Sequence, residues 1–171
     1  AKEFELAIQW LMDAGLVHKV CQVSKPEAPL TFYEESDAFK LFLLDCGLLG
    51  AMNMTDATEA MLTDNIFEEY NGALTEQLVL QELKCVPNLP VYYYNKPNSQ
   101  QEIDFVIEIK NRAIPVEAKA GENLQAKSLK QFIQENKSEK AIKTSLKQYK
   151  GNEIIDNVPL YALYCYLQEL H

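Results

Sequence analysis

The sequence predicts a mixed α/β (α+β) fold in which helices pack across a small mixed sheet. Residues 102–119 form two runs of alternating apolar and polar side chains around a polar centre, as in a β-hairpin. Residues 73–84 place apolar side chains three and four positions apart, as in a helix that buries one face. These two patterns define the centre of the fold, and the remaining elements are arranged around them.

The first part of the chain predicts a helix, two strands and a short helix. The opening apolar side chains follow helical spacing as far as Gly15, which suits the end of a helix. The runs LVHKVCQV and AFKLFLL predict strands, and SKPEAP between them predicts a break. Asp45 is placed to cap a short helix over CGLLGAM. This order resembles the end of a winged helix, so we expect one segment over residues 1–62 and a second domain over residues 63–171.

The second part predicts the order helix, three strands, helix, strand, helix. VYYYN and the two runs of the hairpin supply the three strands. LQAKSLKQFIQEN predicts a helix with Leu129, Phe132 and Ile133 inward, and KAIKTS predicts a strand. In the closing NVPLYALYCYLQEL, Pro159 suits the first turn of a helix, although the aromatic residues also permit an extended start.

Composition excludes several classes of protein. The chain has 171 residues of which 47% are hydrophobic, and no apolar run approaches the ~18 residues of a membrane span. The four cysteines show no CxxC spacing, which favours a reducing cytoplasm over a zinc site. With only two histidines, a histidine-rich metal site is not expected. The absence of an initiator methionine suggests a piece of a longer protein, and the chemistry left to this piece is that of carboxylates and lysines.

Charge is divided unevenly along the chain. The net charge is −9, but residues 1–83 hold four lysines against 15 acids, whereas residues 84–171 hold 12 basic residues against 10 acids. Seven lysines lie within residues 127–150. The acidic first half argues against DNA docking there, because phosphate contacts need a basic surface. The lysines of residues 127–150 predict either a solvated helix face or a strip that follows phosphates.

The hairpin brings three charged residues to one face of the sheet. We expect a two-residue turn at Asn111 and Arg112, which places Asp104 opposite Lys119. In the same register Glu117 lies one pair away on the same face, so the two carboxyl groups can converge. A three-residue loop would instead place Glu117 across the sheet from Asp104.

Two converging carboxylates repel each other, and a divalent cation would compensate. Oxygen ligands without histidine or cysteine favour Mg²⁺ or Mn²⁺. Asp104 and Glu117 would be ligands, the carbonyl of Ala118 between Glu117 and Lys119 could add another, and Glu76 could add a third carboxylate if its helix packs over this face. Glu76 lies within the apolar stripe of its helix, where an ion pair at the margin is the alternative. Spacing alone also permits a buried ion pair of Lys119 with Asp104 and Glu117 in place of a metal.

These residues resemble a known superfamily. A helix glutamate followed by Asp104 and then EAK, in this order of elements, resembles the PD-(D/E)xK nucleases. The blocks AFKLFLLDCGLL, GALTEQLVLQEL, YYYN, EIDFVIE and IPVEAKAG together resemble the C-terminal domain of unknown function that follows the ATPase module of many prokaryotic AAA-type ATPases. The resemblance implies that Asp104 and Glu117 are metal ligands, Lys119 is the catalytic lysine and Glu76 is the supporting acid. This chain departs from the pattern at Ile103, which replaces the naming proline, and near Asn95, where only Lys96 is basic.

The resemblance implies a Mg²⁺-dependent nuclease that acts on DNA at the tail of an ATPase. No Gly-x4-Gly-Lys-[Ser/Thr] motif occurs in these residues, so the implied ATPase would lie upstream in the full-length chain. The alternative is a catalytically inactive module of the same fold that binds proteins or regulates the ATPase.

Overall fold

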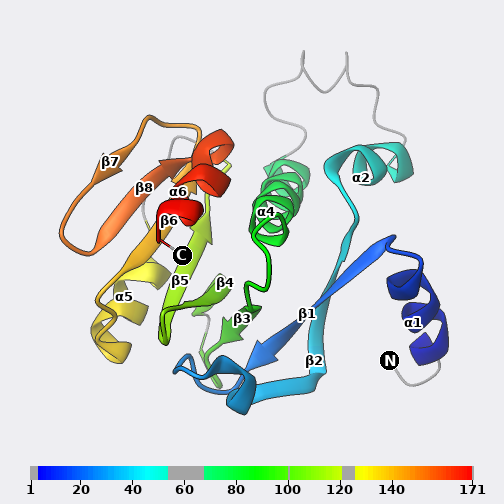
Figure 1. The fold of residues 1–171 in the computed structure, drawn as a ribbon, viewed down its shortest axis with the longest axis horizontal. Helices are drawn as coiled ribbons and strands as arrows, with labels where there is room; N and C mark the ends of the chain where they lie inside the picture. The colour runs from blue at the N-terminus through cyan, green and yellow to red at the C-terminus, as the bar shows by residue number, and fades with distance from the viewer. Residues whose placement is uncertain (1–3, 54–67, 100, 121–125, 171) are drawn as a thin grey trace.

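The computed structural model describes residues 4–53, 68–99, 101–120 and 126–170. Within these residues the chain forms five α-helices, two short 3-10 helices and one mixed eight-stranded sheet of order β2-β1-β3-β4-β5-β6-β8-β7 (Figure 1). The strands are β1 (Val17–Val23), β2 (Glu34–Leu43), β3 (Val91–Asn95), β4 (Glu102–Ile109), β5 (Arg112–Ala118), β6 (Ala141–Ser145), β7 (Lys150–Gly151) and β8 (Ile155–Pro159). The α-helices are α1 (Glu5–Asp13), α2 (Cys46–Met52), α4 (Glu68–Lys84), α5 (Lys127–Asn136) and α6 (Leu163–Leu170), and the 3-10 helices are η2 (Leu30–Tyr33) and η3 (Leu160–Ala162). The mixed α+β class is therefore confirmed.

One sheet runs through both predicted segments. β1 pairs antiparallel with β2 and also parallel with β3, where Gln22 stands opposite Tyr93. The predicted boundary between residues 62 and 63 falls outside the described residues. Within the described part, the N-terminal hairpin extends the C-terminal sheet.

Helices cover the two faces of the sheet with separate cores. On one face, α4 and α6 pack on alternate strand positions, and the buried side chains include Val79, Leu80, Leu83, Phe105, Val116, Leu163 and Leu167. On the other face, α5 packs Leu129 and Phe132 against Tyr92, Tyr94, Ile103 and Val106. Strand alternation accounts for this division, because successive side chains point to opposite faces.

The short helix α2 follows the sequence prediction. The side chain of Asp45 accepts a hydrogen bond of 2.7 Å from the backbone N–H of Leu48 and so caps the helix. By contrast, α1 buries none of its residues, and Phe4 and Trp10 are 64% and 66% exposed. The helix predicted before Gly15 is present, and it lies at the outside of the β1–β2 hairpin (Figure 1).

The hairpin turn lies one residue earlier than predicted. Lys110 and Asn111 form it with φ of 50° and 60°, and Arg112 already pairs with Ile109. A tight turn between twisted strands needs two residues at positive φ, a conformation that asparagine tolerates well. The predicted turn at Asn111 and Arg112 is wrong. The pairing moves by two positions, so Phe105 stands opposite Val116 and the continuation of the register brings Asp104 toward Glu117 instead of Lys119. The prediction that Ile103 shares a face with Phe105 and Ile107 is wrong, because Ile103 packs with Val106 on the α5 face.

The end of the chain contains a short strand, β7, that the sequence prediction missed, and a strand, β8, that it left as an alternative. β7 and β8 pair with each other, and β8 also lies parallel to β6. A helix starting at Pro159 is wrong, since this residue ends β8 and the helix α6 begins at Leu163 after a 3-10 turn. The extended start that the aromatic residues permitted is the observed one. No helix among the described residues is long and apolar enough to cross a membrane.

Candidate functional site

Charged side chains from β2, α4, β4 and β5 gather where the two predicted segments meet. The residues of this charged cluster are Lys40, Glu76, Glu102, Asp104, Glu117 and Lys119. Four are acids and two are lysines. The structure therefore brings together the three acids that the sequence analysis selected, which are Glu76, Asp104 and Glu117, and the lysine Lys119.

An irregularity in β4 positions Asp104. The register between β3 and β4 shifts by one between Tyr92 and Tyr94, so that Tyr93 stands against both Asp104 and Phe105. Such a bulge turns a side chain away from the regular alternation. The Asp104 carboxylate receives a hydrogen bond of 2.8 Å from the backbone N–H of Ala118. The contact that ties Ala118 to the site is thus its N–H, and a metal-binding role for its carbonyl stays a prediction.

The environment makes Asp104 a weak acid. Burial raises the pKa of Asp104 to about 7, and the negative charges of Glu117 and Glu76 add to this shift. The N–H of Ala118 and the charge of Lys119 oppose it. The carboxyl group therefore exchanges its proton near neutral pH, which is the range in which acid-base and metal chemistry operates.

Glu117 is the most deeply buried member of the charged cluster, with 4% of its surface exposed. Its Oε1 lies 2.6 Å from Nζ of Lys119. Its Oε2 is buried and has no hydrogen-bond partner among the described residues. Burial raises the pKa of Glu117, although Lys119 opposes the shift. A buried carboxylate oxygen without a partner is costly, and a proton or a cation would satisfy it.

Lys119 is held in place from two directions. Its backbone N–H donates to the carbonyl of Thr144 on β6 at 2.9 Å, while its Nζ contacts Glu117. Burial opposes the charge of Lys119, but the hydrogen bond and charge of Glu117 outweigh burial and raise its pKa. Lys119 is consequently a fixed cation beside Asp104 and Glu117.

Glu76 takes the alternative role that sequence analysis left open. Its Oε2 lies 3.6 Å from Nζ of Lys40, which also contacts Oε1 of Glu102 at 2.6 Å. Nζ of Lys40 lies 5.2 Å from the centre of the Tyr93 ring. Sequence analysis missed Lys40 and Glu102, although Lys40 carries the same signal as Asp104, a charge inside an apolar strand.

The acids fit a hard cation as a pair. Among the described residues, no group of three or more histidine, cysteine, aspartate or glutamate side chains is placed to hold a metal. Mg²⁺ is commonly bound by one or two carboxylates with waters and substrate phosphates in the other positions. Asp104 and Glu117, on neighbouring strands and with one oxygen left unsatisfied, meet that smaller requirement.

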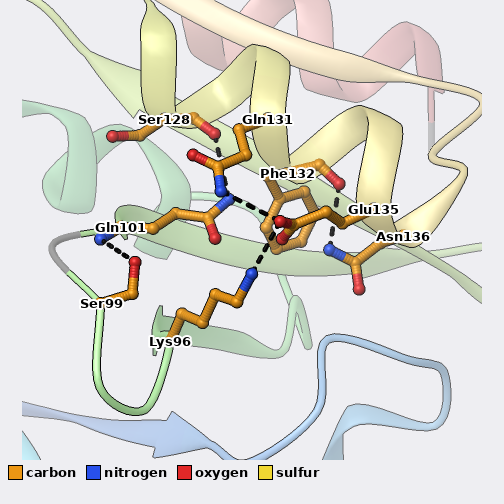
Figure 2. Close-up of polar contacts among 8 residues, drawn as sticks. All are labelled: Lys96, Ser99, Gln101, Ser128, Gln131, Phe132, Glu135 and Asn136. Atoms are coloured by element: carbon orange, nitrogen blue, oxygen red, sulfur yellow. Dashed lines mark hydrogen bonds and ion pairs between the residues drawn. The ribbon is translucent and has the colours of Figure 1, made fainter.

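Lys96, the single basic residue near Asn95, is engaged elsewhere. Its Nζ lies 2.7 Å from Oε1 of Glu135 on α5, and Gln131 donates to the same oxygen at 3.0 Å (Figure 2). Figure 2 also shows the side chain of Gln101, which is 4% exposed, lying against this helix. These contacts fasten the β3–β4 connection to α5, and they leave Lys96 without a role in the charged cluster.

Residues 71–164 match a family described as a domain of unknown function, DUF4143. The match spans more than half of the chain. The chain belongs to the DUF4143 family. DUF4143 domains are commonly found with AAA-type ATPases, which confirms the coarser part of the resemblance. Residues 1–59 match a second domain of unknown function, DUF8612. No curated protein and no solved structure matches the chain.

The charged cluster draws on both matched regions. Glu76, Asp104, Glu117 and Lys119 lie within the DUF4143 match, whereas Lys40 lies within the DUF8612 match. Lys40 nevertheless contacts two acids of the DUF4143 part. The site is therefore built by the two regions together.

Proposed function

We propose that the DUF4143 part carries a metal-dependent phosphodiesterase site of the PD-(D/E)xK nuclease type. The observation that supports this most directly is Glu117, a buried glutamate with one unsatisfied oxygen. Its charge acts on Asp104, and its Oε1 is bonded to Lys119. A purely structural ion pair would satisfy both oxygens of such a buried carboxylate. Mg²⁺ or Mn²⁺ is the proposed occupant.

Each side chain has a defined task in this proposal. Asp104 and Glu117 would hold the cation, which supplies a more acidic bound water and neutralises charge on the phosphoryl oxygen. Lys119, held by Glu117, is placed to stabilise negative charge that develops on a phosphodiester. Glu76 and Lys40 form an ion pair in the same charged cluster, and Lys40 offsets part of its negative charge.

DNA is the proposed substrate and an upstream ATPase module of the full-length chain is the proposed partner. The superfamily resemblance supports the first, and the association of DUF4143 domains with AAA-type ATPases supports the second. On this proposal the ATPase would control when the site meets DNA.

The second candidate is an inactive module with the same fold that binds or regulates the ATPase. Two lysines already contact three acids of the charged cluster, at 2.6 Å for Lys119 with Glu117 and 2.6 Å for Lys40 with Glu102. The described residues contain no group of three metal-ligating side chains. Internal neutralisation of this kind favours a site that keeps its acids without using them.

Nucleic-acid cleavage separates the two candidates. We expect the 171-residue chain to cleave labelled DNA with Mg²⁺ or Mn²⁺ and not with EDTA. Asp104→Asn and Lys119→Met should each lower the rate by about 10²-fold or more, since each removes a group that meets the reacting phosphate or its cation. Glu153→Gln removes an exposed carboxylate elsewhere and should leave the rate unchanged.

Calorimetric titration with Mg²⁺ gives the second readout. The phosphodiesterase is supported if the wild-type chain binds Mg²⁺ and cleaves DNA, and if Glu117→Gln abolishes the binding. Binding without cleavage of any DNA or RNA supports the inactive module. The metal site is contradicted if the wild-type chain neither binds Mg²⁺ nor cleaves.

A further inference from the structure

A basic groove lies between α5 and the end of the sheet formed by β6, β8 and β7. Its lining includes four lysines and no aspartate or glutamate among the described residues. The charged, aromatic and apolar residues at its wall are Lys130, Lys143, Lys147, Lys150, Tyr149 and Leu146. The groove therefore concentrates positive charge on a protein whose net charge is −9.

No described residue forms an ion pair with any of the four groove lysines. Burial lowers the pKa of Lys143, and the positive charges of Lys130 and Lys147 lower it further. Other lysines of this chain are paired with acids, as Lys40, Lys96 and Lys140 are. The groove is thus electrostatically incomplete, and an anion would complete it.

The loop that carries Lys147 and Tyr149 is held in shape by buried polar residues. The side chain of Asn157 donates to the carbonyl of Gln148 at 3.0 Å and accepts from Ser145 Oγ at 2.8 Å. The same hydroxyl accepts from the N–H of Lys147 at 3.2 Å. The lysines are therefore presented on a preorganised loop, which lowers the entropic cost of binding a ligand.

The groove leads to the charged cluster. Lys143 stands directly opposite Glu117 in the parallel pairing of β5 with β6, so the two side chains share a sheet face. The charge of Lys119 also acts on Lys143. A chain of phosphates that follows Lys147, Lys130 and Lys143 would reach Glu117 and Lys119 next.

The wall of the groove offers apolar surface beside the charges. Leu146 is 76% exposed and Tyr149 is 57% exposed. The Tyr149 ring is supported from behind by Tyr166, with the ring centres 6.3 Å apart. An exposed ring next to lysines can stack on a base only if that base is unpaired, whereas the edges of a duplex leave no base face free.

We propose that this groove binds a single-stranded nucleic acid, with the lysines on its phosphates and Tyr149 on a base. The path of the nucleic acid toward Glu117 rests on the proposed function, because a phosphodiester must reach the catalytic residues only if the site is a phosphodiesterase. The binding itself rests on the groove alone. This assigns a substrate form to the site and a role to four of the seven lysines of residues 127–150.

Fluorescence anisotropy in EDTA tests the groove without any cleavage. The probes are a labelled 20-nucleotide oligothymidine and a 20-base-pair duplex, titrated with the 171-residue chain at several KCl concentrations. We expect tighter binding of the single strand and an affinity that falls with salt. Lys147→Glu and Lys150→Glu together should weaken binding at least tenfold and flatten the salt dependence.

Matched variants separate the contributions. Tyr149→Ala should weaken binding of the single-stranded probe by about tenfold. The salt dependence of the affinity should stay unchanged, since stacking involves no counterion release. Lys25→Glu reverses one charge, as each of the two groove substitutions does, at an exposed lysine outside the groove, and it should alter the affinity less than twofold.

Three results would overturn the groove proposal: no binding of the single strand, equal weakening by Lys25→Glu, or binding that ignores Tyr149→Ala and is displaced equally well by inorganic polyphosphate. None of these results concerns cleavage with Mg²⁺. A chain that binds oligothymidine in EDTA but never cleaves it would keep the groove and contradict the phosphodiesterase, so the two proposals fail separately.

Discussion

At the scale of single residues, charged side chains inside apolar strands mark the residues that form the charged cluster. Asp104, Glu117 and Lys40 all interrupt apolar runs, and all three come together in the charged cluster. Burial without full compensation makes the two acids hold protons more tightly than they would in water. The amount by which Asp104 and Glu117 change the free energy of unfolding therefore depends on pH.

We predict that Asp104→Asn makes the stability of the protein less sensitive to pH. The pKa of Asp104 is raised from 3.8 to about 7, so between these values the folded chain holds a proton that the unfolded chain has lost. Unfolding then releases a proton, and the free energy of unfolding falls as pH rises through this window. Asparagine keeps an oxygen that can accept the N–H of Ala118 and carries no charge.

The measurement is urea unfolding at pH 5.5 and pH 8. We expect the wild-type chain to lose on the order of 1 kcal/mol more than Asp104→Asn between these two conditions. Glu153→Gln, with an exposed carboxylate, should follow the wild-type chain. Parallel pH dependence of the wild type and Asp104→Asn would contradict the raised pKa.

At the scale of elements, the turn of the β4–β5 hairpin decides which charged residues meet. The turn residues Lys110 and Asn111 both lie at positive φ. Moving the turn by one residue brought Asp104 toward Glu117 instead of Lys119 and kept the faces of Phe105 and Ile107, whereas the bulge in β4 moved Ile103 to the other face. A shift of the pairing by an odd number would have sent the acids to opposite faces.

We predict that Lys110→Asn with Asn111→Gly stabilises the protein by about 0.5–1 kcal/mol, because Asn-Gly is the preferred pair for a two-residue turn with positive φ. Thermal and urea unfolding measure the change. Arg112→Gly is the matched control. In the structure Arg112 is an extended residue paired with Ile109, with its guanidinium 3.1 Å from Glu139, so glycine there should destabilise. Stabilisation by Arg112→Gly instead would place the turn at Asn111 and Arg112.

At the scale of the whole molecule, a buried amide fastens the N-terminal hairpin to α4. Gln77 is 2% exposed, accepts from the N–H of Leu43 at 3.0 Å and donates to the carbonyl of the same residue at 2.8 Å. This side chain completes the backbone hydrogen bonding at the end of β2. The same strand, β2, carries Lys40, and the same helix, α4, carries Glu76.

We predict that Gln77→Met lowers the free energy of unfolding by about 1–3 kcal/mol, because it leaves the N–H and carbonyl of Leu43 without their partners. Hydrogen exchange should accelerate at the amides of β2 more than at those of β6. Gln134→Met, an exposed glutamine on α5, is the control and should change neither quantity. Uniform acceleration across the sheet would contradict a local fastening role.

The sequence by itself determined the types of the central elements and most faces of their side chains, because both follow from local periodicity; the bulge in β4, which moves Ile103 to the other face, leaves no such signal. The helix over α4, the strands β3 to β5 and the cap at Asp45 were predictable for this reason. Asp104 and Glu117 were also predictable as a pair, since the period of two in a strand survives a pairing shift of two. Only the tertiary structure decided which charge meets which, because register and partners depend on contacts between residues distant in the sequence. Such contacts place Lys40 in the charged cluster. They also bring four lysines to the lining of one groove.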